Sequence, residues 1–239
     1  MHTFFLIEVG IALLYVLTIY GYYVNFHFGK FWFFFTNQTL IASLLCSVVG
    51  AIISKRLNSE TAKVDNLDKD EATKNSRFTL ELFHSLLLQY MVPASALVTI
   101  VYWTLIFPSF SYREYQIVFH TFYDVVAHLF VFIYSMIQLN HYSTKHISID
   151  RRALWLVIPA IFIFFTGSYF FYQLYDSFVY PFLDWDKYSF AWIFYVALPI
   201  VPLPFYLLNH IIIKRSKSRL TTQEVENVVE LEVITASEA

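Results

Sequence analysis

The chain has 239 residues, of which 58% are hydrophobic and 14% are charged, and its formal net charge is −2. Its apolar residues come in runs of about twenty, the length that ~30 Å of bilayer hydrocarbon demands of a helix. This composition predicts a multi-pass membrane protein and leaves little sequence for a soluble domain. The near-neutral charge gives no reason to expect a nucleic-acid partner, and a single cysteine, Cys46, excludes a disulfide within the chain.

Six apolar runs predict the helices. We place them at residues 4–24, 31–54, 78–107, 117–139, 153–175 and 189–213. The first is expected to be a retained span and not a signal peptide, because no cleavage site of small residues follows it. The predicted fold class is therefore all-α: an integral membrane bundle of six transmembrane helices that forms one domain over residues 1–213. Residues 214–239 are expected to form a cytosolic, disordered tail.

Charged and proline residues add detail to these helices. Glu8 lies near the start of the first one, where a long carboxylate side chain can reach the headgroups. Pro93 is expected to kink the third helix. Pro199, Pro202 and Pro204 are expected to interrupt the last one, because proline cannot donate the backbone hydrogen bond that a helix interior requires.

The distribution of Lys and Arg predicts the orientation in the membrane. Six crossings put both termini on one side, together with the loops at 55–77 and 140–152. This side carries 13 of the 16 Lys and Arg residues, and the opposite loops hold the other three, Lys30, Arg113 and Lys187. Since cytosolic loops carry the positive excess, both termini are expected in the cytosol.

The fourth predicted helix carries a polar stripe. His120, Asp124 and His128 recur every four residues, so they lie on one side of a helix. Ionisable groups at membrane depth are costly unless they face a partner, a cavity or water, which makes the stripe a candidate functional site. Asp124 is a candidate to orient either histidine, although each histidine taken alone is more simply a satisfied core group. The stripe offers three metal ligands, but no fourth is evident, so we expect no metal and no other cofactor.

The second predicted helix opens with FWFFFTNQTL, which places Thr36, Asn37 and Gln38 in an apolar segment. A hydroxyl becomes a nucleophile when a base within hydrogen-bond reach takes its proton, and imidazole suits that role near neutral pH. A Thr–His pair inside the membrane would therefore be able to attack an ester carbonyl delivered from the bilayer. Taken singly, a helix threonine more often bonds the carbonyl four residues earlier.

Several segments together resemble a known family. They are KFWFFFTNQTLIASLLCSVVG in the second helix, VYWTLIFP at the end of the third, YDVVAHLFVFIYSM in the fourth, the Asn-His-Tyr exit at 140–142, and FVYPFLD before the sixth. In pattern and order they resemble the androgen-induced protein/ADTRP family of multi-pass membrane hydrolases. The resemblance implies threonine-dependent hydrolysis of esters between a fatty acid and a hydroxy fatty acid. Carried over, it implies that Thr36 is the nucleophile and His128 the general base.

Alternatives stay open at the level of the sequence. His120 is the alternative base, because its expected depth in the membrane matches that of Thr36 better than the depth of His128 does. Asn37 and Gln38 are candidates to support an oxyanion. One alternative function is a proton- or ion-coupled carrier or channel that uses the polar stripe of the fourth helix. Another is a lipid acyltransferase, in which a lipid hydroxyl or amine resolves the acyl-threonine.

The expected partner is a lipid ester substrate. Such an ester partitions into the bilayer at ~0.8 kcal/mol for each methylene buried, so it should reach Thr36 sideways between helices. Phe34 and the turn with Tyr180 and Phe182 lie on the same predicted side and are candidates for a substrate gate. An ordinary aromatic belt at the interface is the alternative. The protein is expected in the endoplasmic reticulum, another endomembrane or the plasma membrane, and its oligomeric state is left open.

Overall fold

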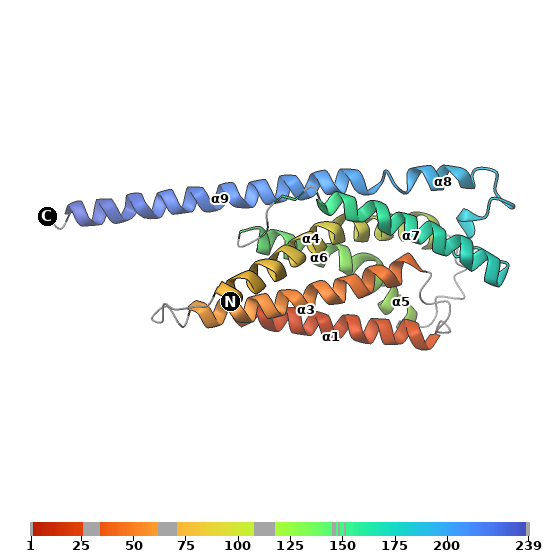
Figure 1. Ribbon diagram of the computed structural model, residues 1–239, viewed down its shortest axis with the longest axis horizontal. Helices are drawn as coiled ribbons and strands as arrows, with labels where there is room; N and C mark the ends of the chain where they lie inside the picture. Colours follow the sequence, from red (N-terminus) through yellow and green to blue (C-terminus); the bar gives the residue numbers. More distant parts are fainter. Residues whose placement is uncertain are drawn as a thin grey trace.

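The computed structural model describes residues 2–25, 34–61, 71–107, 118–144, 147, 149–150 and 152–237. Within these residues every regular element is a helix and no strand occurs, which confirms the all-α prediction. The long helices lie lengthwise beside one another in one bundle, and the last helix projects past the others toward the C-terminus (Figure 1).

The helices follow the predicted spans. In chain order they are α1 (His2–Asn25), α3 (Phe35–Thr61), α4 (Glu71–Val101), α5 (Val118–Val125), α6 (Val131–Ser143), α7 (Arg152–Tyr175), α8 (Ala191–Ala197) and α9 (Pro202–Ser237). Two segments are π turns: η1 (Tyr102–Ile106) follows α4, and η3 (Val126–Phe130) joins α5 to α6. A 3-10 turn, η4 (Pro181–Leu183), lies between α7 and α8. The predicted fourth span is therefore α5, η3 and α6 in unbroken succession.

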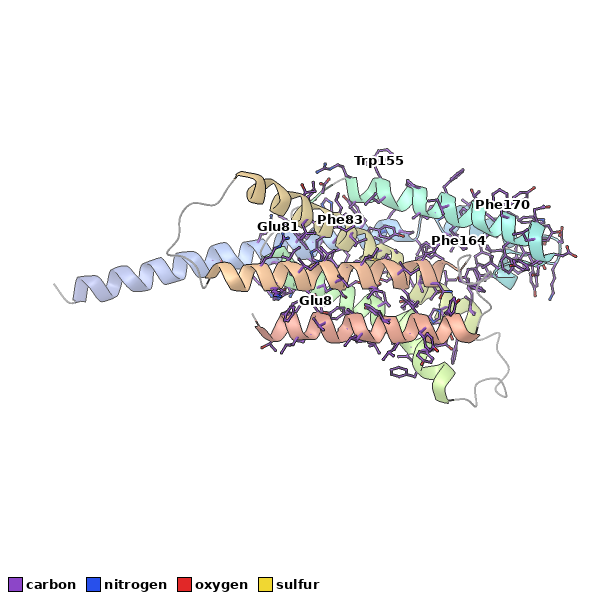
Figure 2. All side chains as sticks on the ribbon, turned by 60° about the horizontal axis from the view of Figure 1, so that its bottom comes forward. Glu8, Glu81, Phe83, Trp155, Phe164 and Phe170 are labelled. Atoms are coloured by element: carbon purple, nitrogen blue, oxygen red, sulfur yellow. The ribbon has the colours of Figure 1, made fainter. Side chains whose placement is uncertain are left out.

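Among the described residues, five helical segments are long and apolar enough to cross a membrane. They are Thr3–Gly21, Phe35–Arg56, Thr79–Ile106, Phe122–Ser143 and Ala191–Arg219. The predicted fifth span coincides with α7, a helix of 24 residues. On its outer surface Trp155 and Phe170 are 67% and 55% exposed (Figure 2). Large exposed apolar side chains and long apolar helices together fit a multi-pass membrane protein.

The last predicted span is interrupted where its prolines predict. α8 ends at Ala197, Pro199 lies in a turn, and α9 begins at Pro202. Pro202 and Pro204 lie in the first turn of α9, where a backbone N–H would have no helical acceptor, so proline is tolerated there. Pro93 lies inside α4.

The segment expected to form a disordered tail belongs to α9 in the structure. α9 continues as helix through this segment as far as Ser237. The stretch from Lys214 to Ser237 contains neither glycine nor proline, and its Lys, Arg, Glu, Gln and Leu residues favour helix. Extending a helix is easier than starting one. Since this stretch contains no helix-breaking residue, the helix that begins at Pro202 continues through it.

Two clusters of buried apolar side chains fill the bundle. The first lies between α1, α3, α4 and α6 and includes Leu88 and Tyr142. The second joins the first turn of α3 to the end of α4, to α7 and to the loop before α8, and includes Phe35 and Phe164. Both π turns and the first turn of α3 meet at the edge of the second cluster. The candidate site is built there.

Candidate active site

Thr36 lies in the first turn of α3. The Phe34 carbonyl accepts the N–H groups of Asn37 and Gln38, at 3.1 and 3.3 Å, so the helix starts directly after Phe34. Thr36 is the second residue of this helix. Thr39, one turn further on, does bond the carbonyl four residues earlier, at 2.9 Å. The Thr36 hydroxyl instead meets a side chain of another helix.

That side chain is His128. The distance from Thr36 Oγ1 to Nε2 of the imidazole is 3.3 Å, across 92 positions of sequence. Both residues are buried, with 7% of Thr36 and 6% of His128 exposed. The structure thus brings together the two residues that the sequence analysis selects as nucleophile and base. The contact is long for a hydrogen bond, as such contacts often are before substrate binds.

His128 lies in the π turn η3, a type of turn that is frequent at functional sites. Its Nδ1 lies 2.9 Å from the backbone oxygen of Asp124. A carbonyl can only accept, so Nδ1 carries the ring proton and Nε2 of the neutral ring keeps its lone pair. This arrangement favours the tautomer in which the imidazole accepts the proton of Thr36.

The Asp124 carboxylate also lies near this ring. Its Oδ1 is 4.0 Å from Nδ1 of His128, which is too far for a hydrogen bond. Its negative charge would nevertheless stabilise an imidazolium. Asp124 therefore lies where an orienting residue was predicted, but its backbone oxygen, and not its carboxylate, makes the hydrogen bond.

The expected difference in depth does not keep Thr36 and His128 apart. Figure 1 and Figure 2 show α5 running at an angle to α3, so an inner part of the fourth span reaches the start of α3. The side chain of His120 lies outside the described residues. Its role as the alternative base stays a prediction.

An apolar pocket opens beside Thr36. It lies between the first turn of α3, the end of α4 with η1, α7 and the loop before α8, and its cavity volume is about 30 Å³. A cavity of this volume holds about two water molecules, so an acyl chain enters only when the walls move apart. Among the residues that line it, hydroxyl groups come from Thr36, Tyr102 and Tyr180. Its apolar walls include Leu97, Val98, Ile161, Phe164 and Leu198.

Known proteins add no further information on this site. No family model, curated protein or solved structure matches this chain.

The predicted gate residues border the pocket. Tyr180 and Phe182 line it, and Phe34 packs edge-on against Tyr180 with ring centroids 5.7 Å apart. The aromatic residues at 31–33 lie outside the described residues. By contrast, Asn37 and Gln38 are not among the residues that line the pocket, so their support of an oxyanion stays a prediction from sequence proximity.

Tyr102 is a site residue that the sequence analysis does not single out. It belongs to η1 and is 4% exposed. Its ring lies on the imidazole of His128, with centroids 3.5 Å apart and 12° between the planes. The signal in the sequence is only its place in the segment VYWTLIFP, because a stack between two π turns cannot be inferred from spacing along one helix.

The position of Glu8 differs from the one expected from the sequence. The sequence places it at the headgroups, but the structure buries it completely, and Figure 2 shows it between α1 and α3. Its two carboxylate oxygens accept hydrogen bonds from Nε2 of Gln138, at 3.0 and 2.9 Å. Oε1 also accepts from the Tyr142 hydroxyl at 3.3 Å. Glu8 is a buried, hydrogen-bonded group and not a snorkelling one.

Gly50 makes room for this carboxylate. A Cβ added to Gly50 would lie 3.0 Å from the Tyr142 hydroxyl and 3.1 Å from Oε1 of Glu8. The same hydroxyl lies 3.0 Å from the Gly50 carbonyl and 2.9 Å from Oγ of Ser54. Along α3, Gly50 is about 21 Å from Thr36 at ~1.5 Å per residue. The Glu8 network is therefore separate from the Thr36 site.

In the described part of the chain, no group of three or more His, Cys, Asp and Glu side chains is arranged to hold a metal ion. The full stripe of the fourth span is not covered by this finding, because it includes the side chain of His120.

Proposed function

We propose that the protein is a membrane-embedded hydrolase of lipid esters, with Thr36 as nucleophile and His128 as general base. The observation that carries this proposal is the buried contact of 3.3 Å between Thr36 Oγ1 and His128 Nε2, at the wall of an apolar pocket. A hydroxyl beside an oriented base is the arrangement that nucleophilic catalysis needs. The resemblance to the androgen-induced protein/ADTRP family supports the same pair and suggests esters between a fatty acid and a hydroxy fatty acid.

The reaction begins with acylation of Thr36. Nε2 of His128 takes the hydroxyl proton while Oγ1 forms a bond to the ester carbonyl carbon, and the π electron pair moves onto the carbonyl oxygen. When that pair returns, the bond between the carbon and the leaving oxygen breaks. His128 gives its proton to that oxygen, which releases the hydroxy lipid and leaves acyl-Thr36.

Water then resolves the acyl-threonine. Nε2 of His128 takes a proton from water as the water oxygen attacks the acyl carbon, and collapse of the second intermediate returns an electron pair to Oγ1 of Thr36. Thr36 recovers a proton from His128 and the fatty acid leaves. The hydrogen bond from Nδ1 to the Asp124 carbonyl, 2.9 Å, holds the ring in one orientation through both halves, and the Asp124 carboxylate at 4.0 Å favours the imidazolium.

The setting fits a substrate delivered by the membrane. The pocket walls are apolar, so they suit an acyl chain that already lies in the bilayer. The excess of Lys and Arg on one side supports an orientation with both termini in the cytosol. We infer an integral protein of the endomembrane system or plasma membrane.

The test is hydrolysis of a branched fatty acid ester of a hydroxy fatty acid by the purified full chain. Thr36→Ala should abolish turnover, and a serine-hydrolase-type probe should label Thr36 in the wild type. Thr39→Ala is the matched control, because the Thr39 hydroxyl bonds its own helix backbone. Full activity of a folded Thr36→Ala variant would refute the mechanism.

Two further measurements separate the alternative functions. Transfer of the acyl group to added lysolipid would indicate an acyltransferase that shares the acyl-threonine. A proton flux across proteoliposomes that depends on Asp124, together with no labelling of Thr36, would indicate a carrier.

A further inference from the structure

Aromatic contacts hold Tyr180 at the candidate site. It lies in the loop that follows α7 and is 8% exposed. Its ring stacks on Phe182 with centroids 5.5 Å apart and 13° between the planes. It also meets Phe34 edge-on at 5.7 Å and Phe164 at 5.9 Å. Contacts with three other rings fix the place of its hydroxyl.

The hydroxyl of Tyr180 lies at the reactive end of the pocket. It interacts with the side chain of Thr36 and with the backbone N–H groups of Phe35 and Thr36. These N–H groups belong to the first turn of α3, where a helix offers them no carbonyl partner. They can only donate, so the tyrosine oxygen accepts from them, and its own O–H donates to Oγ1 of Thr36, whose proton is directed at His128. Burial raises the pKa of the Tyr180 hydroxyl, so it keeps that proton at neutral pH.

We propose that Tyr180 is a catalytic residue, whose O–H donates a hydrogen bond to the carbonyl oxygen of the substrate as that oxygen becomes negative. This inference rests on the proposed function of Thr36 and His128. As Oγ1 of Thr36 bonds to the carbonyl carbon, the π pair moves onto the carbonyl oxygen, and His128 holds the proton taken from Thr36. Tyr180 neither gains nor loses a proton. Its fixed O–H dipole stabilises the developing charge, which is a strong effect in a site that excludes water.

Tyr180 combines two properties that this role needs. It lines the pocket where the acyl group would lie, and it interacts with the nucleophile itself. Tyr102 also lines the pocket, but its ring is stacked on the imidazole of His128. That position suits orientation of the base.

The direct test is Tyr180→Phe, which removes the hydroxyl and keeps the ring that packs against Phe34 and Phe182. We expect kcat to fall by about 10²–10³-fold, the usual loss for one oxyanion donor, with KM nearly unchanged. Tyr195→Phe is the matched control. Its hydroxyl lies 3.4 Å from the Leu183 carbonyl, close to the same loop, and Tyr195 does not line the pocket. Its kcat should remain near that of the wild type.

A second measurement separates a catalytic role from a structural one. A long-chain alkyl trifluoromethyl ketone forms a tetrahedral adduct with a hydroxyl nucleophile, whereas the uncharged amide analogue of the ester resembles the ground state. In Tyr180→Phe, affinity for the ketone should fall by the same factor as kcat/KM, and affinity for the amide should not change. An unchanged kcat, or an equal loss of affinity for both ligands, would overturn the role of Tyr180.

The outcomes also distinguish this inference from the proposed function. If Thr36→Ala retains full activity, the hydrolase mechanism itself fails. If Thr36→Ala is inactive while Tyr180→Phe is fully active, the mechanism stands and only the role of Tyr180 is refuted.

Discussion

The ring of Tyr102 covers one face of the His128 imidazole, and each residue comes from a π turn. A π turn places one more residue in a helical turn than an α turn does, which redirects the side chains around it. The two irregular turns therefore meet through these rings. The stack sets the plane in which Nε2 of His128 faces Thr36.

The contribution of Tyr102 to activity should come from the stacking of its ring on His128 and not from its hydroxyl. We expect Tyr102→Phe to retain most activity, because it preserves the stack. Tyr102→Ala should lower kcat by about 10²-fold, the cost of a misplacement of about 1 Å at a reacting group. Steady-state kinetics on both variants check this, and equal activity of the two would contradict an orienting role.

Replacement of either histidine should identify the base. His128→Gln keeps a hydrogen-bonding side chain of similar size but cannot take a proton, so kcat should fall by about 10²–10⁴-fold. His120→Gln should stay close to the wild type. The reverse pattern, with His120→Gln inactive and His128→Gln active, would assign the base to His120 and contradict the geometry of the Thr36 contact.

Phe182 should influence which acyl chains are accepted. Its ring lines the pocket, so Phe182→Ala should enlarge the pocket and shift the preferred chain length, with a smaller effect on thermal stability. The measurement is kcat/KM across a series of saturated acyl chains. Phe170→Ala is the control, because Phe170 is 55% exposed on the outer surface of α7. If the preferred chain length is unchanged in Phe182→Ala, these aromatic residues form an ordinary interfacial belt and not a substrate gate.

Gly50 should tolerate no larger side chain. In Gly50→Ala the new Cβ would lie 3.0 Å from the Tyr142 hydroxyl and 3.1 Å from Oε1 of Glu8. We expect a loss of about 1–3 kcal/mol of stability from this overpacking. Gly10→Ala in α1 is the control, since a Cβ there has no neighbour within 4 Å. Thermal unfolding of both variants in the same detergent checks this, and equal midpoints would argue against the packing described.

The sequence predicts what depends on local patterns. Runs of apolar residues are sufficient to predict where the long helices lie, and the interruption near Pro199 follows from the chemistry of proline. Thr36 and His128 can be selected as candidate site residues because few polar groups occur in such runs. The family resemblance then suggests them as a pair. The contact between them needs the angle of α5, which depends on packing that no single segment encodes.

Long-range contacts explain what the sequence does not predict. Glu8 alone in an apolar helix suggests an interfacial residue, since nothing nearby in the chain can satisfy it. Its partner Gln138 lies on α6, and the space for its carboxylate comes from Gly50 on α3. Tyr102 is likewise defined by a ring on another helix. Such groups become recognisable only when three helices are placed together.

The position of Gln138, 130 residues after Glu8, has a consequence for biogenesis. At roughly 5–20 residues per second, this separation corresponds to about 7–26 s of synthesis. Glu8 is therefore synthesised before Gln138 exists, and a carboxylate without its partner is costly in hydrocarbon. α1 is thus made well before its polar contacts can be completed.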